Sequence, residues 1–318
     1  MKHIEGKKFN ININRPKVLF IGNGLFYNDC NWDTFIDMCR RNDLDELKWN
    51  DNKNNVPYSI KANVACDHND DKRRNTYIEQ IKKLINDKEI YNKNYSNLKD
   101  LLELPFDAIL TTNYTYQIEN MLDNNFVNKS DSVLRNTYRC CTKTKRDYTF
   151  FLHTFNRVKT KDIWHLHGEE RLKSSIVLTH DEYGRLSGEV RKYFQKNGNR
   201  YLNFENDLEM KSWLDYLIMG DVYVVGYGAD FSEFVFWWLL GRRLREKSKY
   251  GSIYFYEPKI EIPNKSNVGK IFALDQSKVN FENLNFVFKD KEDEKYEDFY
   301  KAAVLDIKSK IASNGFGS

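Results

Sequence analysis

The strongest constraint on the fold is a set of apolar runs, each ending in glycine or a short polar residue and leading into a helical pattern. Three of them are "KVLFIGNG" at 17–24, "FDAILTT" at 106–112 and "DVYVVGYG" at 221–228. A strand that is apolar on both faces must be covered on both faces, as in parallel sheets flanked by helices. We therefore predict an α/β fold with a doubly wound parallel sheet of Rossmann-like type.

The rest of the chain continues this alternation, and we expect a single catalytic domain over 1–318. Within it, 42–104 is predicted to be a helical and loop insertion, and 123–160 a small inserted lobe, because both are rich in polar residues. Further strands are predicted at 162–168, 174–180, 252–258 and 284–290, and helices at 32–41, 76–87, 95–104, 113–122, 181–194, 213–220, 230–247 and 295–311.

Composition narrows the class of protein. A hydrophobic content of 41% with 15% aromatic residues favours a folded globule. The longest apolar stretch, 234–240, is too short to span a bilayer, and the first thirteen residues hold no continuous apolar segment of the secretory kind. Five cysteines without a CxxC pair suit a reducing compartment. We expect a cytoplasmic protein that does not contact membranes.

The charge balance gives no sign of a nucleic-acid partner. Fifty Lys and Arg residues stand against 46 Asp and Glu residues, a net charge of +4. The basic clusters at 143–146 and 242–247 are typical of solvated faces. Direct nucleic-acid binding is therefore not expected.

Two of the six histidines, His165 and His167, stand two positions apart at the end of an apolar run. Residues two apart on a strand face the same side, so one of them can be an ordinary buried histidine. The pair can also be read as metal ligands or as a catalytic base. A metal would need further ligands, and His153 and His180 lie in no ligand-like motif. We expect no metal.

Ligands of doubly wound sheets bind where the strands end and the helices begin. Gly22 and Gly24 stand at such an end, and glycines there let backbone N–H groups approach a phosphate. The same glycines can serve turn geometry alone, and both interpretations stay open. Asn113, after the next strand, can likewise be a helix N-cap or a functional side chain.

Four pieces occur in one order along the chain: "FIGNGLF", "FDAILTTNYTYQIE", "WHLHGEE…SSIVLTHDEY" and "VYVVGYGADFSEF". "TTNY" followed by "HLHG" and "LTHDEY" is much more specific than any glycine pattern. With these motifs the chain resembles the sirtuin-like NAD-consuming family, particularly its bacterial branch found in antiphage defence. The resemblance extends from about residue 17 to about residue 234.

The resemblance implies that Asn113 is the active-site asparagine, orienting the nicotinamide ribose and the attacking water, and that His167 is the catalytic histidine. His165 becomes a supporting residue on the same strand face. NAD⁺ is then the substrate, and no metal takes part. The residues implied to bind the dinucleotide are Gly22, Asn23, Gly24, Thr112, Gly226, Tyr227, Asp230 and Glu257.

The implied activity is hydrolysis of NAD⁺ to nicotinamide and ADP-ribose, by an effector that depletes NAD⁺ in antiphage defence by abortive infection. The zinc-binding cysteine pairs of protein-deacetylating sirtuins are missing, so deacetylation is not expected. Thr115 stands where the family commonly has an acid, which favours an alternative: a weak or inactive NAD- or ADP-ribose-sensing subunit of a defence complex. The expected partners are further copies of the chain, a partner ATPase or translocase, or a phage-derived trigger.

Overall fold

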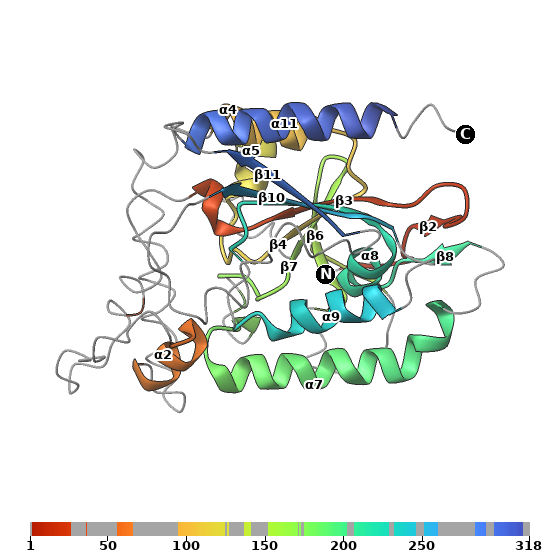
Figure 1. The fold of residues 1–318 in the computed structure, drawn as a ribbon. Helices are drawn as coiled ribbons and strands as arrows, with labels where there is room; N and C mark the ends of the chain where they lie inside the picture. The colour runs from red at the N-terminus through yellow and green to blue at the C-terminus, as the bar shows by residue number, and fades with distance from the viewer. Residues whose placement is uncertain are drawn as a thin grey trace.

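The chain is described here from a computed structural model, which describes residues 2–26, 36, 56–65, 95–124, 126, 137–140, 152–170, 172, 175–201, 207–228, 232–245, 251–259, 284–290 and 296–313. Within these residues a nine-stranded sheet lies between two layers of helices (Figure 1). The predicted helix 76–87, and all of the predicted helix 32–41 except Ile36, lie outside the described residues.

Six neighbouring strands of the sheet are parallel. Counted along the chain, they stand in the order third, second, first, fourth, fifth, sixth, which is the order of the Rossmann fold. The predicted doubly wound α/β fold is thereby confirmed. In spatial order the strands are β7 (Lys161–His165), β4 (Ala108–Thr111), β3 (Lys17–Ile21), β9 (Asp221–Val225), β10 (Ile253–Lys259) and β11 (Leu284–Asp290).

Three more strands extend the sheet beyond β7. β6 (Thr154–Val158) pairs antiparallel with β7, β5 (Thr137–Cys140) pairs antiparallel with β6, and β1 (Lys2–Ile4) lies parallel to β5. The segment expected to be a small lobe thus contributes two strands to the main sheet. The short strands β2 (Lys8–Phe9) and β8 (Leu208–Glu209) form a separate antiparallel pair.

Helices cover both faces of the sheet (Figure 1). On one face lie α4 (Tyr95–Glu103), α5 (Gln117–Leu122) and α11 (Tyr296–Ser313). On the other lie α7 (His180–Asn197), α8 (Trp213–Met219) and α9 (Phe234–Arg245). The short α2 (Tyr58–Ala65) lies beside α7, and the 3₁₀ turns η1 (Asn23–Phe26) and η6 (Gly198–Tyr201) follow β3 and α7. None of the described helices is long and apolar enough to cross a lipid bilayer.

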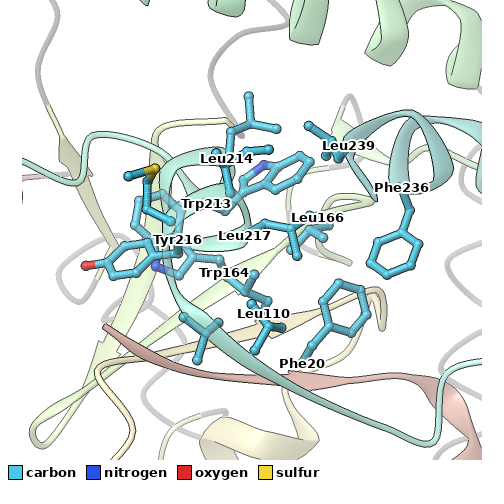
Figure 2. Packing of buried hydrophobic residues seen from close by; sticks show 14 of the residues in the cluster. Phe20, Leu110, Trp164, Leu166, Trp213, Leu214, Tyr216, Leu217, Phe236 and Leu239 are labelled. Atoms are coloured by element: carbon cyan, nitrogen blue, oxygen red, sulfur yellow. The ribbon is translucent and has the colours of Figure 1, made fainter. Parts of the chain in front are cut away.

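The central strands β3, β4 and β9 are mostly apolar because their side chains alternate between two buried cores. Val18 and Phe20 of β3 point toward α8 and α9, whereas Leu19 and Ile21 point toward the opposite helices. Figure 2 shows the first core, in which Phe20 and its neighbours on β4 and β7 pack against aromatic and leucine side chains of α8 and α9. Burial on both faces explains why these strands carry no polar alternation.

Two local predictions are wrong. The apolar run at 174–180 is no strand where it is described: 176–178 form a buried loop, and the N–H of Thr179 donates to the Glu182 carboxylate at the start of α7. The helix predicted at 113–122 begins only at Gln117, with Tyr116 as its N-cap residue. Asn113 therefore does not cap that helix.

Candidate functional site

The carboxyl ends of β4 and β7 place Asn113 and His167 at one edge of the sheet. The two strands are neighbours, and Thr111 stands opposite His165 in their register. Asn113 and His167 each lie two residues beyond these partners. The segments stay together past the strands, since the N–H of Glu170 donates to the carbonyl of Tyr114 at 2.8 Å. The fold thus brings the two residues, far apart in sequence, to adjacent strand ends.

The backbone of Asn113 is held on both sides, but its side chain is not. Its N–H donates to Oγ1 of Thr111 at 3.1 Å, and its carbonyl accepts a hydrogen bond from His165. The residue is 9% exposed, and its Nδ2 has no hydrogen-bond partner in the described part of the chain. Leaving such a donor unsatisfied costs about 1–3 kcal/mol. The buried amide is therefore ready to donate to an oxygen of a ligand.

His165 is a fully partnered buried cation. Its Nδ1 lies 2.6 Å from the carbonyl oxygen of Asn113, and its Nε2 lies 2.8 Å from Oε1 of Glu119. A carbonyl and a carboxylate only accept, so both ring nitrogens donate and the ring is an imidazolium. Burial alone would lower the pKa of His165, but the charge and hydrogen bond of Glu119 outweigh it and raise that pKa to about 9.

Polar side chains surround this cation. Nδ2 of Asn156 donates to Glu119 at 3.0 Å and to Glu169 at 3.1 Å, and the ring of Tyr116 meets His165 edge-on at 5.7 Å. His165, Asn156 and Glu169 also line a small hollow together with other residues. The Glu119–His165 pair therefore stabilises the backbone that carries Asn113, and leaves His165 no free lone pair.

His167 has a different environment. Its Nε2 lies 3.2 Å from Oε2 of Glu233, and its ring meets Tyr183 edge-on at 5.2 Å. The hydroxyl of Tyr183 donates to Oε1 of Glu233 at 2.9 Å. Burial alone would raise the pKa of Glu233, but the His167 imidazole at 3.2 Å and the hydrogen bond from Tyr183 lower it. Glu233 is therefore a carboxylate that faces the imidazole.

The two histidines do not share one face, contrary to the sequence interpretation. Alternation stops because β7 ends at His165, and the chain then turns at Gly168, which has a φ of +87°. A Cβ on Gly168 would come within 2.2 Å of the Ser175 carbonyl oxygen, so only glycine fits this turn. His165 consequently contacts α5, whereas His167 contacts α7 and the residue before α9.

Glu233 was missed by the sequence reasoning. It directly precedes an apolar helix, where an acid is common because it favours the helix N-terminus. No spacing relates it to His167. The only signal available was its place shortly after the glycine-rich end of a predicted strand.

The predicted glycines hold two strand ends together. The N–H of Gly22 donates to the carbonyl of Val225 at 3.0 Å, and the N–H of Gly24 donates to that of Gly226 at 2.7 Å. Gly226 has a φ of +67°, and a Cβ on Gly22 would lie 2.3 Å from its oxygen. These contacts join β3 and β9 where the strand order reverses. Turn geometry thus accounts for the glycines, and their contact with a dinucleotide stays a prediction.

The remaining predicted residues are spread along the same edge. Thr112 is half-buried beside Asn113, and Asn23 lies in η1. Glu257 is in β10, one residue beyond the partner of Val225, so its backbone reaches the edge as well. Asp230 lies outside the described residues.

Tyr227 follows Gly226 but packs into the core. Its ring lies 4.7 Å from that of Phe20 and 5.0 Å from that of Phe236, and the residue is buried. It also lies close enough to Glu233 to contribute to the lowered pKa of that carboxyl. The structure therefore places Tyr227 in the core, near Glu233.

No group of three or more His, Cys, Asp or Glu side chains suited to a metal ion occurs among the described residues. The two further histidines considered from the sequence have other partners. His153 donates from Nδ1 to the Lys211 carbonyl at 2.7 Å, and Nδ1 of His180 lies 3.3 Å from the Ser59 hydroxyl. Neither contacts His165 or His167 in this arrangement.

A family model described as a SIR2-like domain matches residues 107–229. The SIR2-like segment runs from the start of β4 to just past β9, so it contains Asn113, both histidines and Gly226. The match supports a sirtuin-like family and an NAD-related activity. No curated protein matches the chain. Glu233 lies just beyond the SIR2-like segment.

Proposed function

We propose that this protein is an NAD⁺ hydrolase, which breaks the bond between nicotinamide and ribose and yields nicotinamide and ADP-ribose. One observation carries the proposal: the buried side-chain amide of Asn113 has an unpartnered donor among the described residues, at the sheet edge it shares with His167. The SIR2-like match supports NAD⁺ as the substrate. The resemblance of "TTNY" and "HLHG" to the family's motifs supports the two roles below.

Asn113 is the positioning group. Nδ2 donates a hydrogen bond to a ribose hydroxyl or to the attacking water, and so holds the oxygen in place. The backbone of Asn113 cannot shift, because Thr111 and His165 bind its N–H and its carbonyl. Such preorganisation lowers the barrier by reducing the entropy lost when the reacting atoms meet.

His167 is the general base. A neutral imidazole has one nitrogen that donates and one that accepts, so it can take the proton of a ribose hydroxyl or of water. His165 cannot serve, because both of its nitrogens already donate. Of the two histidines of "HLHG", His165 is thus a structural cation and His167 is the base.

We also propose that the protein acts as an effector, in multiple copies or with a partner, that depletes NAD⁺ during antiphage defence. The resemblance to the defence branch supports this role. The sensor alternative has one observation in its favour: Thr115 is 5% exposed and brings no charge where the family commonly has an acid. A weak or inactive enzyme that retains NAD⁺ or ADP-ribose would fit that substitution.

The test is to incubate the purified chain with NAD⁺ and to quantify nicotinamide and ADP-ribose by chromatography. We expect both products in equal amounts, and a loss of about 10²–10⁴-fold in Asn113→Ala and His167→Ala. Binding of ADP-ribose without nicotinamide release would support the sensor alternative. The absence of both release and binding would refute both forms of the proposal, and full activity in both variants would refute the roles of Asn113 and His167.

The cellular role is tested separately. Cells that express the wild-type chain should lose NAD⁺ after phage infection, and cells that express His167→Ala at the same level should not. Unchanged NAD⁺ in infected wild-type cells would contradict the effector role while leaving the enzymatic proposal to the assay above.

A further inference from the structure

Glu233 is held rigidly beside His167. Its Oε1 accepts the Tyr183 hydroxyl at 2.9 Å, and its backbone carbonyl accepts the N–H of Trp237 at 3.1 Å in the first turn of α9. The preceding residue is also tied down, since Oγ of Ser232 accepts the N–H of Ser59 from α2 at 2.9 Å. The carboxylate therefore has a defined place, with Oε2 at 3.2 Å from Nε2 of His167.

This contact decides which nitrogen of His167 carries the proton. A carboxylate only accepts, so Nε2 is the protonated nitrogen of the neutral ring. Nδ1 has no hydrogen-bond partner within the described residues. The accepting lone pair of the ring is consequently on Nδ1.

We propose that Glu233 is a positioning residue that keeps the proton of neutral His167 on Nε2 and so makes Nδ1 the nitrogen that accepts a proton during NAD⁺ cleavage. The part that concerns the reaction rests on the proposed function. The part that concerns the tautomer rests on the structure alone. When the base acts, the proton of the ribose hydroxyl or water moves to Nδ1, and the carboxylate of Glu233 stabilises the resulting imidazolium.

The other titratable groups around the contact are neutral tyrosines. Tyr183 faces it from α7, Tyr227 from the turn after β9, and Tyr114, next to Asn113, faces Tyr183. Burial and then the charge of Glu233 raise the pKa of Tyr183 well above its ordinary value, so its hydroxyl stays protonated. Among the described residues around this contact, Glu233 therefore supplies the negative charge that His167 meets.

The first test needs no activity. In protein labelled with ¹⁵N-histidine, long-range proton–nitrogen spectra report which nitrogen of each neutral ring is protonated. His167→Asn identifies the signal. We expect the Nε2–H form of His167 in the wild type, and a mixture of both forms in Glu233→Ala. An Nδ1–H form in the wild type, or no change in Glu233→Ala, would overturn the proposal, whether or not the chain cleaves NAD⁺.

The second test measures nicotinamide release by Glu233→Gln. We expect kcat to fall about 10–100-fold with KM changed less than about twofold, because the residue acts through the base. Glu233→Asp should recover part of kcat.

The matched control is Glu189→Gln on α7, which removes a carboxylate that pairs with exposed Lys192 at 2.7 Å, away from the site. It should leave kcat and KM unchanged. An unchanged or higher kcat in Glu233→Gln would overturn the catalytic part of the proposal, and a higher kcat would identify Glu233 as an inhibitory contact. Wild-type protein without nicotinamide release would refute the proposed function, and the tautomer result would still stand by itself.

Discussion

His165 and His167 stand two residues apart, and each lies beside a glutamate. Their rings nevertheless differ in how many hydrogen-bond partners they have. His165 is buried with an acceptor on each ring nitrogen, so its hydrogen-bonding capacity is used up. His167 meets a carboxylate at Nε2 alone within the described residues, at the edge where the amide of Asn113 is also unpartnered. The first environment stabilises a fold, whereas the second leaves groups available to a ligand.

The difference shows that partners, and not residue type or spacing, decide what a histidine does. Both rings are buried, and both face a negative charge. The number of acceptors around each ring separates the buried cation His165 from the proposed base His167. The different roles of the two histidines can therefore be tested by changing either histidine or either glutamate and measuring activity and stability together.

The largest effect is expected on activity from His167→Ala. Nicotinamide release should fall by about 10²–10⁴-fold, because the general base is lost, while the midpoint of urea unfolding changes little. His165→Ala should show the reverse order, with a lower midpoint as its main defect. Two results would contradict these roles for the two histidines. One is that His167→Ala unfolds at a much lower urea concentration; the other is that His165→Ala loses all activity with unchanged stability.

The next effect is on stability, from removal of the carboxylate of the structural pair. Glu119→Ala leaves the buried imidazolium of His165 uncompensated, which should lower the free energy of unfolding by about 3–5 kcal/mol. Urea unfolding followed by circular dichroism measures it. Glu189→Ala on α7 is the control, since loss of an exposed pair should cost less than about 0.5 kcal/mol. Equal effects in both variants would contradict the buried-pair description.

The third effect is on the pH dependence of stability. The folded pKa of His165 is raised to about 9, so the Glu119 pair stabilises the fold fully below the unfolded pKa of about 6.5. That stability should be lost as the pH rises through about 9. Melting temperatures of the wild type and His165→Gln should therefore differ most near pH 6 and converge above pH 9. A gap that widens with pH would have the wrong sign.

The smallest effect is expected from Asn113→Ala on stability. Its Nδ2 has no partner in the described part of the chain, so removing the side chain removes an unsatisfied donor. The free energy of unfolding should stay the same or rise by up to about 1 kcal/mol, although activity is lost. Functional groups commonly reduce stability in this way. A loss of stability like that of Glu119→Ala would show that the amide has a structural partner instead.

The central strands were predictable from the sequence because their burial on both faces is visible in their amino-acid composition. Runs such as "KVLFI" and "AILT" are apolar on both faces, and only a sheet covered on both sides buries them. β5 and β6 were not foreseen, since the alternation of "TYRC" covers only four residues and "TFNRV" does not alternate strictly. The run at 174–180 was wrongly predicted to be a strand, because a buried loop can be as apolar as a strand.

The candidate site was predictable only in part. Adjacent parallel strands end at the same edge, so the sequence could place Asn113 and His167 near each other. It could not show that β7 stops at His165, which turns the two histidines toward different helices. Nor could it relate Glu119 to one ring and Glu233 to the other, because such pairings are made by the tertiary fold. The sequence suggested that the glycines of "GNG" bind a phosphate. In the fold, the N–H groups of Gly22 and Gly24 instead donate to the carbonyls of Val225 and Gly226 at the end of β9.

The most direct test of the account is a crystal structure of His167→Ala soaked with NAD⁺, in which the substrate is held without being cleaved. We predict an oxygen of the nicotinamide ribose, or a water bound to it, within hydrogen-bond distance of Nδ2 of Asn113, with the Glu119–His165 pair unchanged. NAD⁺ bound elsewhere on the molecule, with the Asn113 amide still unpartnered, would contradict it.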